Sequence, residues 1–216
     1  MYFGVILLET EKKCEQLVKA IYDNMDASHD FQHIERVLMN AEAILQTEPT
    51  ANEKIVKLAV YLHDVSDPKY AADKSDEQRI LQELQLTDEE IEHIQAVIAS
   101  VSFNGGNELE AETLEAKIVR DADRLDAIGA VGIARTFAYG GAKGRKLYDD
   151  AEEAREDMSV EEYRAKSTAS VTHFYEKLLL LKELMVTSKG KEMAEDRHQF
   201  MVLFLQQLKN ERDGIA

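Results

Sequence analysis

The stretch Leu-Ala-Val-Tyr-Leu-His-Asp-Val-Ser-Asp-Pro-Lys, residues 58–69, is an apolar helical run that ends in a histidine and an aspartate. His63 and Asp64 are both costly to bury unless something pairs with them, and a divalent cation can pair with both at once. A histidine at a helix C-terminus can also serve as a cap that interacts with the helix dipole. The pair therefore indicates a metal site only if other parts of the chain supply further ligands.

Apolar residues recur at spacings of three and four along most of the chain, and only two prolines interrupt it, Pro49 and Pro68. This period is that of amphipathic helices, and no segment shows a convincing strand pattern. We therefore predict an all-α protein with one helical domain over residues 1–216. Its C-terminal helices, at about 159–210, are expected to pack on the core that carries the metal ligands.

The predicted helices begin and end at recognisable signals. They cover Thr10–Met25, His33 toward Pro49, Thr50–His63, Ser75–Leu84, Thr87–Ile98, Glu112–Ala138 as one helix or two in tandem, Ser159–Met185 and a last helix from about Met193 to Leu208. Thr50, Ser75 and Thr87 are each followed three residues later by Glu or Gln, which is the spacing of a capping box. Gly129 and Gly132 mark the expected break in the long helix.

The charge of the chain limits its partners. Its 216 residues include 42 acidic and 26 basic ones, which gives a formal net charge of −16. This balance argues against binding to a nucleic acid polymer, because such proteins carry a basic footprint. The single cysteine, Cys14, fits a reducing compartment. The apolar residues 1–8 lack a basic flank and are too few for a signal peptide or a membrane span, so we expect a cytoplasmic protein without membrane contact, either monomeric or a homodimer.

Side chains of the types that bind metals occur inside three apolar helical stretches. These are His33, His63-Asp64 and the run Asp121-Ala-Asp-Arg-Leu-Asp126. Imidazole and carboxylate together suit a mid-row divalent ion better than Ca²⁺, which prefers oxygen ligands only. Helical periodicity places Asp121 and Asp126 closer to the inward face than Asp123. The alternative is that all three are surface acids paired with neighbouring arginines.

The order His33, His63-Asp64, Asp123 resembles the H…HD…D signature of the HD-domain metal-dependent phosphohydrolases. The run 121–130, DADRLDAIGA, is similar to a bacterial stand-alone subgroup of that superfamily, as are residues 132–145 and 173–177. The resemblance implies an HD-type helical bundle and one divalent ion (Mn, Fe, Ni, Zn or Mg) held by those four residues. It selects Asp123 as the last ligand. It also implies hydrolysis of phosphate esters or anhydrides, with nucleotides favoured as substrates of a pyrophosphohydrolase or phosphatase.

Residues beside the metal ligands are candidates for the remaining chemistry. Asp67 resembles an acidic position that some HD hydrolases use, so we assign it general acid/base work; its alternative role is to cap the turn at Pro68. The candidate substrate-binding residues are Lys69, Arg135, Tyr139, Lys143 and Arg145. Residues 139–145 are predicted to form a glycine-rich basic loop that closes over substrate phosphates. His29, His173 and His198 are left as surface or structural residues.

Two other functions fit the same fold. HD oxygenases with a dinuclear iron site use further histidines between the His-Asp pair and the last aspartate, and only His93 lies in that interval. A single extra histidine argues against a second complete metal site. The other alternative is a catalytically inactive module that senses nucleotides. The intact set of four ligands argues against it, because a module without catalysis would tolerate the loss of a ligand.

Overall fold

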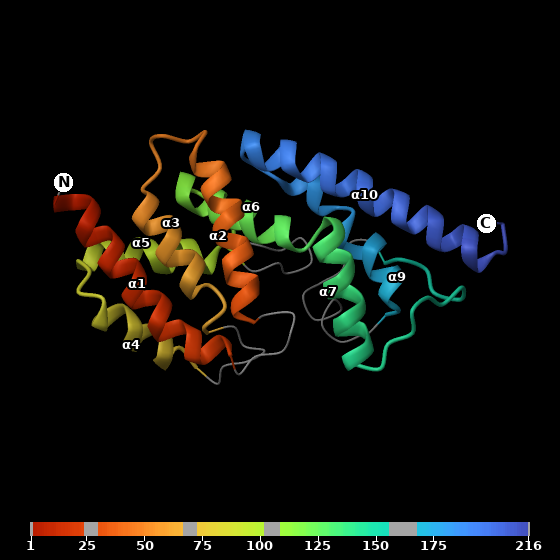
Figure 1. Cartoon of the computed structure of the whole chain (residues 1–216), viewed down its shortest axis with the longest axis horizontal. Helices are drawn as coiled ribbons and strands as arrows, with labels where there is room; N and C mark the ends of the chain where they lie inside the picture. Colours follow the sequence, from red (N-terminus) through yellow and green to blue (C-terminus); the bar gives the residue numbers. More distant parts are fainter. Residues whose placement is uncertain (1, 24–29, 67–72, 102–108, 156–167, 216) are drawn as a thin grey trace. The chain divides into compact units, whose positions relative to one another are not determined.

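The computed structural model describes residues 2–23, 30–66, 73–101, 109–155 and 168–215. All regular elements in these ranges are helical, which confirms the predicted all-α fold (Figure 1). Contacts group the chain into two compact units. The first unit is Met1–Ser102 with Leu109–Ala122, and the second is Phe103–Glu108 with Asp123–Ala216. The organisation of the chain as a single domain stays a prediction.

Helix α3 forms the centre of the first unit. The helices of this unit are α1 (Tyr2–Tyr22), α2 (Phe31–Leu45), α3 (Glu53–Leu62), α4 (Ser75–Glu83), α5 (Asp88–Ala99) and most of α6 (Leu114–Asp126). Helix α3 contacts α1, α2 and α5 (Figure 1). All five residues from 58 to 62 are buried, because the run is apolar on every side and is covered on every side. The C-terminus of α3 therefore delivers His63 and Asp64 from the core.

The predicted helix starts are correct in part. Thr87 and Glu90 form the capping box of α5, as predicted. The prediction for Thr50 is wrong, because α3 begins at Glu53 and its N-cap is Asn52, whose side chain accepts a hydrogen bond from the Ile55 N–H. Asn52 competes for the same role at the position where the chain turns into the helix. Helix α1 begins at Tyr2, well before the predicted start, and α4 has no side-chain cap.

The second unit is built on two long helices and an irregular segment. Its elements are α7 (Gly129–Ala142), α9 (Ser170–His173), the π-helix η1 (Phe174–Leu178), the 3₁₀-helix η2 (Leu181–Leu184) and α10 (Ser188–Arg212). Helix α10 contacts α7 and η2, and α7 also contacts α9. The break between α6 and α7 falls at the predicted place. No helix in the described part of the chain combines the length and the apolar character that a bilayer crossing demands.

The predicted continuous helix over 159–185 is wrong for its described part. From Ser170 onward an α-turn passes into a π-turn, in which the Leu179 N–H donates to the Phe174 carbonyl five residues earlier, and then into a 3₁₀ turn. Apolar residues three or four positions apart are compatible with α-, π- and 3₁₀-helical winding. The sequence pattern therefore does not reveal the change from one to the next. Residues 159–167 lie outside the described residues.

The predicted loop over residues 139–145 is also wrong. Residues 139–142 form the last turn of α7. The Arg145 N–H donates to the Gly140 carbonyl at 2.8 Å, and the Gly144 N–H donates to the Gly141 carbonyl at 3.1 Å. Gly144 has a φ of +66°, so the segment is a Schellman motif that ends the helix. Glycine at this position ends a helix, whereas the glycine-rich sequence predicts a loop.

Candidate metal centre

Three donor side chains of the first unit lie together. Asp64 Oδ2 is 3.5 Å from His33 Nε2 and 3.5 Å from His63 Nε2. The two imidazole rings have centroids 5.5 Å apart, and one donor atom from each of the three residues lies within 4.8 Å of the others. The three residues are 1 %, 7 % and 9 % exposed. Two nitrogens and a carboxylate oxygen thus converge in a largely buried place.

Local structure places each of these side chains. His33 is in the first turn of α2, where its N–H donates to the side chain of the N-cap Asp30 at 3.1 Å. His63 is the C-cap of α3, and Asp64 follows it. Helices α2 and α3 contact each other. The N-terminus of one helix and the C-terminus of the other therefore bring the two histidines and the aspartate together.

The orientation of the His63 ring follows from a backbone contact. His63 Nδ1 lies 2.8 Å from the Val60 carbonyl oxygen. A carbonyl oxygen only accepts hydrogen bonds, so Nδ1 carries the proton and the lone pair is on Nε2, the atom nearest Asp64. Metal-binding histidines are held by such outer contacts in many proteins. The three donors fit a mid-row divalent ion, for which imidazole and carboxylate are suitable ligands.

The aspartates of α6 differ in burial as the helical wheel predicted. Asp121 is 0 % exposed and Asp126 is 2 % exposed, whereas Asp123 is partly exposed. Asp123 belongs to the second unit and is not among the three clustered donors. Its role as the fourth ligand stays a prediction.

Asn40 is a residue that the sequence analysis missed. Its side-chain amide donates to the Ala122 carbonyl at 3.0 Å, within the first unit, and the residue is 5 % exposed. Asn40 lies two turns after His33 on the buried face of α2. A polar residue on an otherwise apolar helix face is the sequence signal that could have identified Asn40. The bond ties the helix of His33 to the residue before Asp123.

The predicted substrate-binding residues have different surroundings. Asp67 and Lys69 lie outside the described residues. Arg135 Nη1 is 2.5 Å from the buried carboxylate of Asp126, which favours a structural role for this arginine. Tyr139 receives two cations on its ring: Lys143 Nζ is 5.6 Å and Arg145 Cζ is 5.2 Å from the ring centroid. Three of the five predicted residues thus meet at the C-terminal end of α7.

His93 contacts residues other than the clustered donors. Its Nε2 is 3.4 Å from Thr113 Oγ1 and 3.4 Å from Glu115 Oε2. Glu115 also accepts a hydrogen bond from the Asn52 N–H at 2.7 Å. This network joins the starts of α3 and α6 to α5, which argues for a structural role for the histidine.

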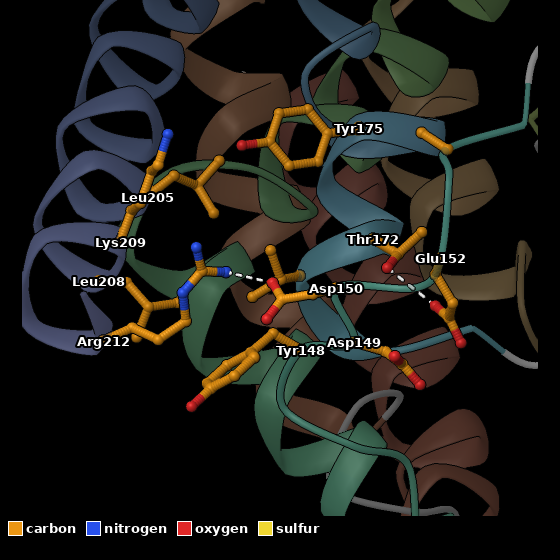
Figure 2. A pocket seen from close by; sticks show the side chains of 12 residues that line it. Tyr148, Asp149, Asp150, Glu152, Thr172, Tyr175, Leu205, Leu208, Lys209 and Arg212 are labelled. Carbon is orange, nitrogen blue, oxygen red and sulfur yellow. Dashed lines mark hydrogen bonds and ion pairs between the residues drawn. The ribbon is translucent and has the colours of Figure 1, made fainter.

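A pocket of about 290 Å³ opens in the second unit (Figure 2). Its lining includes Asp149, Asp150 and Glu152, of which Asp150 pairs with Arg212 at 2.7 Å and Glu152 accepts from Thr172 at 2.9 Å. None of the four predicted substrate-binding residues that the structure describes lines it. The lining also includes the cations Lys209 and Arg212, so this pocket carries charges of both signs.

A protein-family model described as HD domain matches residues 30–128, a range that contains all four predicted metal ligands. The chain is also 37 % identical over 213 residues to YpgQ of Bacillus subtilis, and this match covers 94 % of the chain and 96 % of YpgQ. The chain belongs to the HD-domain superfamily.

Solved structures agree with this assignment. A crystal structure from Lactobacillus plantarum is 33 % identical, with a TM-score of 0.86 over 95 % of this chain and 98 % of that one. An HD-superfamily hydrolase from Bacillus thuringiensis is 38 % identical, with a TM-score of 0.75 over 96 % and 98 %. A crystal structure of YpgQ in complex with ADP is 32 % identical, with a TM-score of 0.74 over 95 % and 100 %.

Proposed function

We propose that this protein is a metal-dependent phosphohydrolase that acts on nucleotides. The observation that carries the proposal is the convergence of His33, His63 and Asp64, a donor set suited to a divalent ion. Hydrolysis is supported by the similar hydrolase from Bacillus thuringiensis, and a nucleotide substrate by the ADP bound to YpgQ. The net charge of −16 supports a small phosphorylated substrate over a nucleic acid polymer.

Metal binding and proton transfer are assigned to different residues. His33, His63 and Asp64, with Asp123 as the proposed fourth ligand, would hold one divalent ion. Such an ion supplies Lewis acidity toward a phosphoryl oxygen and lowers the pKa of the attacking water. Asp67 is proposed to transfer the proton.

The substrate phosphates need cations placed in advance. Lys143 and Arg145 are proposed to bind the phosphate oxygens, since their positions are restrained by the ring of Tyr139. Lys69 is proposed as a further phosphate-binding residue. For Arg135 we propose a structural role in which it forms an ion pair with the buried carboxylate of Asp126 and does not contact the substrate. The homodimer and the cytoplasmic location stay predictions.

The function is tested by metal analysis of the purified protein, followed by a screen for released phosphate and pyrophosphate. Nucleoside mono-, di- and triphosphates are incubated with Mn²⁺, and duplex DNA serves as the polymer control. Pyrophosphate release from triphosphates would identify a pyrophosphohydrolase, and orthophosphate release a phosphatase. Nucleotide binding without hydrolysis under any divalent ion would contradict the proposal and support a sensing module.

Replacing Asp123 by asparagine is expected to weaken metal binding by about 10-fold or more, because one anionic donor is lost while the shape is kept. Titration of the apoprotein with Mn²⁺ measures the effect. Asp196→Asn, the same change at an exposed position of α10, is the control and should bind metal like the wild type. Equal affinity in both variants would remove Asp123 from the site.

A further inference from the structure

The side chain of Arg145 is held in place, and none of the described residues gives it an anionic partner. Its backbone N–H is fixed by the Gly140 carbonyl at the end of α7, and its guanidinium lies over the Tyr139 ring. Its Nε is buried and has no hydrogen-bond partner in the described part of the protein. Neither Arg145 nor Lys143 forms an ion pair with a carboxylate of the described residues. A buried donor without an acceptor is costly and indicates a ligand that supplies one.

Two further groups come from α9 and η1, and one of them, His173, feels the positive charge of Arg145. His173 ends α9, and Lys177 lies four residues later in the π-helix η1. Burial, followed by the positive charges of Lys177 and Arg145, lowers the pKa of His173 to about 3. The imidazole is therefore neutral near pH 7 and can donate one hydrogen bond. His173, predicted from the sequence to be a surface or structural residue, is mostly buried and feels the charge of two cations.

The carboxylate nearest to this group is engaged elsewhere. Glu176 is buried, and one of its oxygens lies 2.7 Å from Arg155 Nε. The other oxygen accepts from Thr168 Oγ1 at 2.9 Å and from Arg155 Nη2 at 3.1 Å. These bonds lower the pKa of Glu176 against the effect of its burial. Glu176 is thus paired with Arg155, and no ion pair joins it to Arg145 in the described part of the chain.

The two segments that supply these groups are joined at a close contact. A Cβ atom at position 140 would lie 2.2 Å from Ser170 Oγ, so only glycine fits there without movement. The Ser170 N–H donates to the Lys146 carbonyl at 3.0 Å, and the Val171 N–H donates to the Leu147 carbonyl at 2.9 Å. The end of α7 is thereby fastened to the start of α9. This contact sets the position of Arg145 relative to His173.

We propose that Arg145, His173 and Lys177, with Lys143 beside them, form an anion site in the second unit that binds the phosphate chain of the nucleotide. The assignment of the anion to a nucleotide rests on the proposed function; the site itself rests on the contacts above. A guanidinium binds phosphate oxygens in pairs, and neighbouring cations suit an anion with several charges. His173 and Lys177 are additions to the residues chosen from the sequence, and Gly140 is a positioning residue.

The first test measures binding of inorganic pyrophosphate by calorimetry in metal-free buffer. Arg145→Ala, Lys177→Ala and His173→Ala are each expected to raise the Kd by about 10-fold or more, the loss expected for one charge-assisted or buried contact. Lys182→Ala is the matched control, because Lys182 is on η2 of the same unit and pairs with Glu195 at 3.1 Å. The control should keep the wild-type Kd.

The second test uses the contact between α7 and α9. Gly140→Ala is expected to weaken pyrophosphate binding, because the new methyl group displaces Ser170 and with it Arg145. Ser170→Ala removes the Oγ atom, and the Cβ atom of residue 170 then lies 3.6 Å from a Cβ at position 140, an ordinary van der Waals distance. The double variant Gly140→Ala/Ser170→Ala should therefore recover binding. Thermal unfolding of all variants separates this effect from a loss of folding.

The outcomes distinguish this site from the proposed function. Pyrophosphate binding that is lost in the three variants, in a protein that hydrolyses no nucleotide, supports the anion site while contradicting the hydrolase. Normal binding and normal KM in folded Arg145→Ala and Lys177→Ala variants of an active enzyme would overturn the anion site and leave the hydrolase standing. Failure of Ser170→Ala to rescue a folded Gly140→Ala variant would overturn the positioning role.

Discussion

Replacing Asp64 by asparagine is expected to lower kcat/KM on the nucleotide substrate on the order of 10³-fold and to abolish tight Mn²⁺ binding. Asp64 is the only carboxylate of the three clustered donors, and its oxygen lies 3.5 Å from each histidine nitrogen. Asparagine keeps the shape but loses the charge that a divalent ion requires. Metal titration and initial rates with added Mn²⁺ measure the two effects.

The fold of this variant should be preserved, because no cavity is made. The control is Asp23→Asn, the same change at an exposed position that follows α1 in the same unit, and it should behave as the wild type. Full activity in Asp64→Asn would show that hydrolysis takes place at another site. Equal loss of activity in Asp23→Asn would show a general effect of charge.

Replacing Arg135 by alanine is expected to lower the free energy of unfolding by about 3 kcal/mol, because it leaves the carboxylate of Asp126 buried without this partner. Asp126 is 2 % exposed, and Arg135 Nη1 lies 2.5 Å from its Oδ2 and 3.3 Å from its backbone carbonyl. For a chain of this size the Tm should fall by about 6–12 °C. Denaturant and thermal unfolding measure the change.

The control for this prediction is Arg79→Ala. Arg79 pairs with Asp76 and Glu83 on the exposed face of α4, where such pairs contribute little, so its loss should change stability by less than about 0.5 kcal/mol. A normal Tm in Arg135→Ala, together with a raised KM for the nucleotide, would contradict the structural role. It would restore Arg135 as a direct phosphate-binding residue.

The fold could be predicted wherever one periodic pattern decided it. The apolar run before His63 identified α3, and the apolar stripes identified α2 and α5. Where two local structures share one signal the prediction failed. Glycines near 140 indicate either a loop or a Schellman stop, and only the hydrogen bond from the Arg145 N–H to Gly140 decides between them. A π-turn after His173 keeps apolar spacing almost unchanged and leaves no mark on the sequence.

The candidate site was predictable to the extent that its residues are chemically unusual for their positions. His33, His63 and Asp64 are polar residues next to apolar stripes, which makes them visible in a sequence. The supporting contacts are not visible in this way. The bond from Asn40 to Ala122 joins residues far apart in the chain, and the partner of Glu176 is an arginine that precedes it by 21 residues. Such pairs depend on tertiary packing, which periodicity does not encode.

The contact between His63 and the Val60 carbonyl affects how the site tolerates mutation. In many metal sites the outer partner of a histidine is a carboxylate side chain, which a single substitution can delete. Here the partner is a peptide group one turn earlier in the same helix, and every amino acid supplies it. Position 60 can therefore vary among apolar residues during evolution while the imidazole keeps its tautomer. The proton on Nδ1 is maintained by the helix itself, independently of the identity of any neighbouring side chain.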